Sequence, residues 1–183
     1  AASEIHKKNG HSSVSGVPCN TFHAEKIFSA YTNKICKSGK DIKIVNMIEE
    51  TVLYLQSQFK KGSKIGLLST TGTRKTFLYS DYLEKAGFKL VQVDENEQDD
   101  VHDIIYNKNW GIKAKSPVTN IAIDSLELYL SQLKDKGANC IILGCTEFPL
   151  ALPSDAYKGI PLVDPVSILA RALIREADSD KLK

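Results

Sequence analysis

The chain contains 183 residues, of which 42% are hydrophobic and 25% are charged, a balance typical of a globular protein with a sizeable core. Lys and Arg number 24 against 22 Asp and Glu, which argues against a nucleic-acid-binding or membrane-surface protein. The apolar runs are far shorter than a bilayer span, and four cysteines do not make a disulfide scaffold. With no export signal visible, we expect a cytoplasmic protein with reduced thiols.

Strand-like and helix-like segments alternate along the chain. Short Val/Ile/Leu-rich strands separated by helices indicate βαβ units, and therefore an α/β fold with a parallel sheet covered by helices on both faces. In chain order, the patterns predict a helix over 1–10, a strand over 12–17, a helix over 21–37, a strand over 42–45, a helix over 47–60, a strand over 64–69, a helix over 75–86, a strand over 89–93, an exposed helix start over 95–103, a helix over 118–136, a strand over 139–144, a strand over 161–163 and a helix over 166–177.

The loop at residues 18–21 carries the first candidate site, because ligands of parallel sheets bind where strands end and helices begin. Cys19 stands just before a predicted helix N-terminus, where free backbone N–H groups favour a thiolate. Asn20 and Thr21 are suited to capping that helix or holding an anion. Position alone leaves a small buried cysteine in a turn as an equal alternative.

The loop after the strand at 139–144 repeats this arrangement, with Cys145 followed by Thr146 and Glu147. Two thiols in matching positions, each followed by a polar residue able to hold a carboxylate, favour a shared site. If the two strands belong to facing lobes, the thiols approach one cleft from opposite sides.

A third loop places Thr71, Gly72 and Thr73 between a strand and a helix. It fails the Walker A pattern, because five residues separate Gly66 from Gly72 and Lys75 is not adjacent to Gly72. Hydroxyl groups and a glycine at a helix N-terminus still form a cradle for a small anion such as a carboxylate. An ordinary Thr-capped turn is the equal alternative.

Zinc binding and hydrolysis fit the sequence less well. Cys140 and Cys145 lie five residues apart on a strand, an odd offset that turns their side chains to opposite faces. We therefore predict no metal site. No GxSxG elbow is present, and a Cys–His hydrolase lacks an evident orienting residue.

Two motifs resemble the aspartate/glutamate racemase family: Pro18-Cys19-Asn20-Thr21-x-His23 and Leu143-Gly144-Cys145-Thr146-Glu147-Phe148-Pro149-Leu150. The aspartate racemase branch is the closer match, because glutamate racemases usually carry His-Tyr-Pro after the second Cys-Thr. Residues 66–73, 112–114 and 161–164 resemble further family segments. The resemblance covers nearly all of residues 1–177.

This resemblance implies a cofactor-independent racemase, with aspartate as the expected substrate, in which Cys19 and Cys145 act as opposed acid and base on the α-carbon. It also implies two pseudo-symmetric α/β lobes with the site in the cleft between them, and a homodimer. Residues 1–43 with 157–183 would form the first lobe, and residues 44–156 the second. The implied substrate-binding residues are Asn20, Thr21, Thr71, Gly72, Thr73, Lys113, Thr146 and Glu147.

The sequence departs from the family at its start. Family members begin with a strand and a Gly-rich loop that would lie upstream of Ala1, so we expect an N-terminally incomplete first lobe. Two alternatives therefore stay open. One is a catalytically inactive amino-acid-binding or regulatory protein, and the other is a related two-cysteine enzyme acting on hydantoins or maleate.

Overall fold

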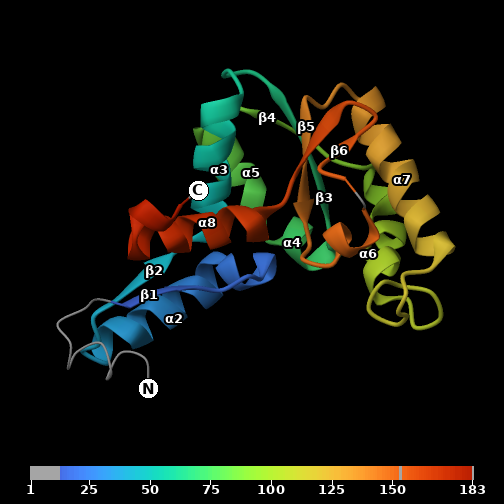
Figure 1. Ribbon diagram of the computed structural model, residues 1–183. Helices are drawn as coiled ribbons and strands as arrows, with labels where there is room; N and C mark the ends of the chain where they lie inside the picture. Colours follow the sequence, from blue (N-terminus) through green and yellow to red (C-terminus); the bar gives the residue numbers. More distant parts are fainter. Residues whose placement is uncertain (1–12, 153, 183) are drawn as a thin grey trace.

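The computed structural model describes residues 13–152 and 154–182 (Figure 1), so the helix predicted over residues 1–10 lies outside the described residues. The strands are β1 (Ser13–Gly16), β2 (Ile42–Val45), β3 (Lys64–Ser69), β4 (Lys89–Val91), β5 (Cys140–Gly144), β6 (Ala156–Tyr157) and β7 (Ile160–Val163). The α-helices are α2 (Glu25–Lys37), α3 (Met47–Gln58), α4 (Thr71–Lys75), α5 (Leu78–Lys85), α6 (Gln98–Tyr106), α7 (Asn120–Asp135) and α8 (Pro165–Ala177). Short 3-10 helices are η1 (Asn20–His23), η2 (Glu95–Glu97), η3 (Phe148–Ala151) and η4 (Ser179–Lys181).

The described strands form two sheets. A five-stranded sheet has the order β4-β3-β5-β7-β6, and β1 and β2 form a separate parallel pair. Every pairing is parallel except that of β6 with β7. The predicted α/β class, with parallel sheets flanked by helices, is confirmed.

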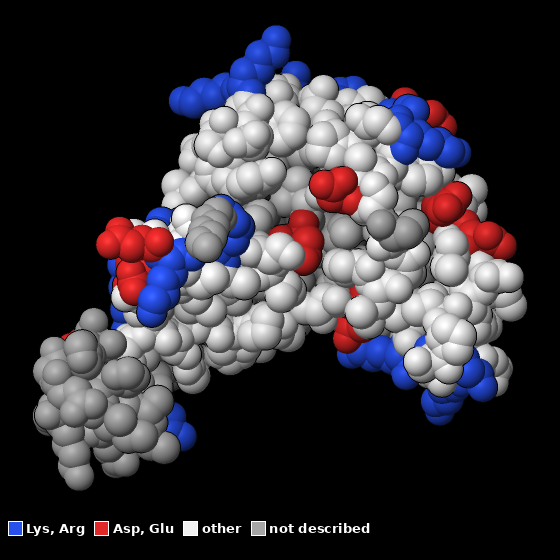
Figure 2. All heavy atoms as spheres, viewed as in Figure 1, with Lys and Arg blue, Asp and Glu red and all other residues white. Residues whose placement is uncertain are grey.

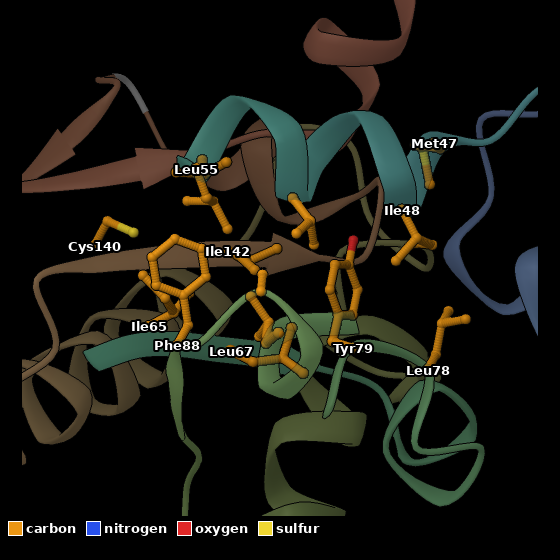
Figure 3. Packing of buried hydrophobic residues seen from close by; sticks show 14 of the residues in the cluster. Met47, Ile48, Leu55, Ile65, Leu67, Leu78, Tyr79, Phe88, Cys140 and Ile142 are labelled. Atoms are coloured by element: carbon orange, nitrogen blue, oxygen red, sulfur yellow. The ribbon is translucent and has the colours of Figure 1, made fainter. Parts of the chain in front are cut away.

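The central strands β3 and β5 are buried on both faces, which explains their continuous apolar sequence. Their side chains alternate between two core clusters, as the pleat requires. On β5, Ile142 packs with the cluster that includes α3 and α5 residues, shown in Figure 3, whereas Ile141 and Leu143 pack with the cluster beneath α6 and α7.

Helix caps set the points at which the chain leaves each strand. The Asn46 side chain accepts hydrogen bonds from the backbone N–H groups of Ile48 (2.9 Å) and Glu49 (3.4 Å), and so begins α3 directly after β2. Asp164 caps α8 in the same way after β7, with Pro165 at the first helical position. These caps satisfy backbone donors that would otherwise lack partners.

Helix α8 connects the two sheets, and Figure 1 shows it running from the large sheet toward β1 and β2. Leu169 of α8 belongs to the α3-side core cluster, and Val14 of β1 packs against the same cluster. Strands β6 and β7 pair within the five-stranded sheet. Apart from Ala156, their residues belong to the range 157–183 that was expected in the first lobe. The division into lobes at the expected boundaries stays a prediction.

Two predicted helices are divided in the structure. The helix predicted over 21–37 is η1 followed by α2, with Ala24 in a non-helical conformation between them. The helix predicted over 75–86 begins earlier as α4 and restarts as α5 after Phe77, which has a left-handed φ of 52°. The apolar periodicity of a segment indicates which face is buried, but it contains no information about a break between two short helices, so each pair was predicted as one helix.

Charged side chains are interspersed on the face shown in Figure 2, where Lys and Arg lie among Asp and Glu. This distribution agrees with the nearly balanced charge of the sequence. Within residues 13–152 and 154–182, no helix has both the length and the apolar character needed to cross a bilayer.

Candidate active site

A cavity of about 130 Å³ lies where β3 and β5 end and η1 begins. Four parts of the chain distant in sequence form its walls: the Cys19 segment, the loop after β3, the segment from the end of α6 to Lys113, and the loop after β5. Its lining residues are Cys19, Asn20, Thr21, Thr70, Thr73, Tyr106, Lys113, Gly144, Cys145, Thr146 and Glu147. The cavity therefore brings both candidate thiols together with six of the eight expected binding residues.

Cys19 stands at the start of η1, and its side chain is exposed. Thr21, on η1, is joined to Thr73 on α4 by a contact of 3.3 Å between their hydroxyl oxygens. This contact connects the Cys19 segment to the loop after β3. Gly72 lies behind it, since a Cβ at Gly72 would be 3.7 Å from the Thr21 methyl carbon.

The Asn20 side chain is buried, with 4% of its surface exposed. Tyr79 of α5 donates a hydrogen bond of 2.6 Å to Asn20 Oδ1. Burial raises the pKa of the Tyr79 phenol, so the phenol stays protonated and acts as the donor. With its oxygen accepting from Tyr79, Asn20 can donate to a ligand through its amide NH₂.

His23 supports the Cys19 segment from within the protein. Its Nε2 donates to the Val17 carbonyl at 3.0 Å, and the Cys19 backbone N–H donates to the same carbonyl at 2.9 Å. Burial lowers the pKa of His23, which keeps the imidazole neutral at pH 7. His23 therefore acts on the position of Cys19 and is not among the described residues that line the cavity.

The Glu147 carboxylate is the centre of a polar cluster after β5. Its Oε2 accepts hydrogen bonds from Cys145 Sγ and Thr146 Oγ1, both at 2.9 Å. Its Oε1 forms an ion pair of 2.9 Å with Lys113 Nζ. One carboxylate thus holds a thiol, a hydroxyl and an ammonium group.

These contacts determine how the groups ionise. Burial, together with the hydrogen bond and negative charge of Glu147, raises the pKa of the Cys145 thiol to about 12. Burial opposes ionisation of Glu147, but the hydrogen bonds from Cys145, Lys113 and Thr146 outweigh it, and the net effect lowers the Glu147 pKa. The hydrogen bond to Glu147 in turn raises the pKa of Lys113. At neutral pH this cluster contains a thiol, a carboxylate and an ammonium group.

Tyr106, at the end of α6, forms the remaining wall with Lys113. The Lys113 ammonium lies 3.4 Å from the Tyr106 hydroxyl and 4.6 Å from the ring centroid. His102 stacks on the same Tyr106 ring, with centroids 4.6 Å apart. The Lys113 backbone N–H donates to the Ile105 carbonyl of α6 at 3.1 Å, which holds the lysine beside this helix.

The predicted binding residues and the observed cavity lining differ at five positions. Thr71 and Gly72 are not among the described residues that line it, and Thr71 instead lines a separate cavity of about 510 Å³. Thr70, Tyr106 and Gly144 line the site without having been singled out. Thr70 follows the predicted strand over 64–69, and Gly144 ends the one over 139–144, so their positions at strand ends could have indicated them. Tyr106 lay in a stretch without recognisable periodicity, so the sequence contained no signal for it.

The described residues contain no group of three or more His, Cys, Asp or Glu side chains arranged to hold a metal ion. Cys140 is buried on β5, where burial raises its pKa to about 12, and it packs in the α3-side cluster. Cys145, which was compared with Cys140 as a possible zinc ligand, lines the cavity instead.

Residues 14–173 match the family of Asp/Glu/hydantoin racemases. The chain belongs to this racemase family. An aspartate racemase from Picrophilus torridus is 27% identical and superposes with a TM-score of 0.71 over 90% of this chain and 62% of that protein. An aspartate racemase homologue from Pyrococcus horikoshii OT3 is 23% identical, with a TM-score of 0.66 over 96% of this chain and 71% of that one, which is evidence for the fold.

A curated protein of Pectobacterium carotovorum subsp. carotovorum, described as "Uncharacterized protein in pnlA 3'region", is 33% identical over 93 residues. That match covers 51% of this chain and 58% of the relative. This racemase-family chain therefore spans about three fifths of the length of the Picrophilus torridus enzyme (62%) and of the Pectobacterium protein (58%).

Proposed function

We propose that this protein is an amino-acid racemase that acts on aspartate without a cofactor, using Cys19 and Cys145 as opposed base and acid. The observation that carries the proposal is that both thiols line one small cavity although they lie 126 positions apart in the sequence. Membership of the Asp/Glu/hydantoin racemase family supports the same reaction class.

Inversion at an amino-acid α-carbon needs a base on one face and an acid on the other, because the α-C–H bond is a very weak acid. Cys145 is suited to be the acid in the resting site, since its thiol donates to Glu147 and keeps its proton. Cys19, on the segment across the cavity, is then the base that removes the α-proton. In the reverse direction the two thiols exchange roles, and Cys145 loses its proton only when the Glu147 carboxylate no longer faces it.

The residues around the thiols fit a small dicarboxylic amino acid. The cavity volume of about 130 Å³ favours a small substrate. Hydroxyl groups of Thr21, Thr73 and Thr146 can donate to the α-carboxylate, where negative charge increases as the proton leaves. We assign Lys113 to the side-chain carboxylate, for which the substrate competes with Glu147.

Proton NMR of L-aspartate in D₂O, under reducing conditions, tests this function. The wild-type protein is expected to remove the α-proton signal and to form D-aspartate. Cys19→Ala and Cys145→Ala are each expected to lower racemisation by about a hundredfold or more, the usual contribution of a general acid or base. Cys36→Ala is the matched control, because Cys36 is an exposed thiol on α2 and is not among the described residues of the cavity.

The outcomes separate the alternatives. Exchange of the α-proton of one enantiomer by one variant identifies the face that the remaining thiol serves. Turnover of a hydantoin but not of aspartate contradicts the aspartate assignment and favours a hydantoin racemase of the same family. Absence of exchange with aspartate, glutamate and hydantoins, while aspartate still binds, contradicts the racemase and favours an amino-acid-binding protein.

We also expect a homodimer in the cytoplasm. Light scattering of the purified protein measures the assembly state, and fractionation of the source cells measures the compartment. A monomer at micromolar concentration that racemises aspartate would contradict the dimer without affecting the proposed chemistry.

A further inference from the structure

Gln98 is a buried polar side chain outside the site cavity that joins three segments. It is the first residue of α6, and 7% of its surface is exposed. Its Nε2 donates to the carbonyl of Ser69, the last residue of β3, at 2.8 Å. Its Oε1 accepts from Arg74 of α4 at 3.0 Å, and the same Arg74 nitrogen donates to the Val93 carbonyl at 2.9 Å.

The Ser69 carbonyl needs this donor because the neighbouring strand ends early. β3 pairs with β4 only as far as Gly66 with Val91, so no β4 residue is paired with Ser69. A buried carbonyl without a donor is costly, and native proteins almost always supply one. The Gln98 side chain fills this place beyond the last β4 pair.

The two residues that Gln98 holds adjoin two residues of the cavity wall. Ser69 precedes Thr70, and Arg74 follows Thr73, which contacts Thr21 across the cavity. The far end of the same helix also touches the site, since Tyr106 lines the cavity. Helix α6 thus contacts the site wall at both ends, through Gln98 at its start and Tyr106 at its end.

Building on the proposed racemase function, we propose that Gln98 is a positioning residue for the Thr70–Thr73 wall of the site. Gln98 is not among the described residues of the site cavity; with Arg74 it lines the adjoining cavity of about 510 Å³, which shares Thr73 with the site. It therefore acts through Ser69 and Arg74 and does not contact the substrate. Its two hydrogen bonds hold the Thr70 and Thr73 hydroxyl groups at the distance that transition-state stabilisation requires.

Two substitutions and one control test this role. Gln98→Met keeps the length of the side chain and removes both hydrogen bonds. Gln98→Glu keeps an acceptor for Arg74 but, when ionised, has no hydrogen to donate to the Ser69 carbonyl. Gln92→Met is the control, because Gln92 lines the same larger cavity and accepts from Lys136 through its backbone carbonyl, which the substitution keeps.

Both Gln98 variants are expected to lower kcat for aspartate racemisation by about tenfold or more, with a smaller change in KM. The kcat is expressed per folded molecule, so that a loss of stability alone does not lower it. Gln92→Met is expected to match the wild type. A kcat for Gln98→Met within about twofold of the wild type overturns the proposal.

Amide hydrogen exchange measures the same role without catalysis. The Arg74 backbone N–H donates to Thr70 O at 3.1 Å, and we expect it to exchange about tenfold faster in Gln98→Met. If the wild type racemises nothing, the proposed function fails, and unchanged exchange at Arg74 separately overturns the positioning role. Faster exchange at Arg74, with exchange at β5 unchanged, supports it.

Discussion

At the scale of single residues, the resting site is dominated by one acidic side chain that already occupies the groups a substrate needs. Glu147 accepts from Cys145 and Thr146 and pairs with Lys113. In the proposed mechanism, an anionic substrate competes with Glu147 for Lys113, and displacement of Glu147 removes the negative charge that faces the Cys145 thiol. The proposal therefore predicts that substrate binding and activation of this thiol are coupled through one carboxylate.

Replacing Glu147 tests this coupling directly. Burial is the largest cause of the raised Cys145 pKa of about 12, and the hydrogen bond and charge of Glu147 raise it further. Glu147→Gln removes the charge and the carboxylate hydrogen bond, so the Cys145 pKa is expected to fall. Each unit of decrease gives about tenfold more thiolate below the pKa. Iodoacetamide labelling of Cys145 at pH 8, followed by mass spectrometry, is expected to be faster in this variant. Equal labelling rates in Glu147→Gln and in the exposed control Glu95→Gln would contradict the prediction.

At the scale of elements, the site depends on how closely β5 approaches β3 at their carboxyl ends. A Cβ at Gly144 would lie 2.9 Å from Leu67 Cδ1 and Ser69 Cβ, and 3.0 Å from the Leu68 carbonyl oxygen. Backbone and strand side chains cannot move aside easily, so only glycine allows this spacing. The close approach places Cys145 directly beside the end of β3.

Two glycine-to-alanine substitutions test this spacing. Gly144→Ala is expected to destabilise the protein by about 1–3 kcal/mol, because the methyl group overpacks the strand ends. Gly72→Ala is the matched control, since its Cβ meets Thr21 only at ordinary contact distances of 3.7 Å and 3.9 Å. Alanine within α4 is expected to be neutral or to stabilise by about 0.5–1 kcal/mol. Urea unfolding measures both, and equal midpoints for the two variants would refute the argument.

At the scale of the whole molecule, packing of helix α8 against β1 adds to the η1 contacts that position the Cys19 segment relative to Cys145. The Cys19 segment follows β1 of the small sheet, whereas Cys145 follows β5 of the large sheet. Leu169 of α8 is buried in the α3-side cluster, and a Cβ on Gly16 of β1 would lie only 2.8 Å from its Cδ1. The position of Cys19 relative to Cys145 therefore depends on packing between α8 and β1.

Truncation of this contact is expected to affect the site as well as the fold. Leu169→Ala removes a buried leucine from the α3-side cluster, and Leu133→Ala removes one from the cluster beneath α6 and α7. Each substitution is expected to lower the free energy of unfolding by about 2–5 kcal/mol. Only Leu169→Ala is expected also to speed hydrogen exchange in β1 and to lower racemisation per folded molecule. A Leu133→Ala variant with the same loss of racemisation would show that general destabilisation is the cause.

The sequence alone determined the α/β class, the parallel strands and the loops that contain both cysteines. These properties are local, because apolar runs, caps and strand ends can be identified from neighbouring residues. The interruption at Phe77 was beyond this reasoning, since a left-handed backbone at a phenylalanine has no signal in the pattern of apolar residues.

Which side chains meet in the site follows from the tertiary structure. It brought Tyr106 and Thr70 into the cavity, left Thr71 and Gly72 outside its described lining, and paired Lys113 with Glu147. It also showed that Gln98 completes the end of β3 from another helix. Such contacts join residues tens of positions apart, and their distances depend on how sheets and helices pack, which no local pattern of residues contains.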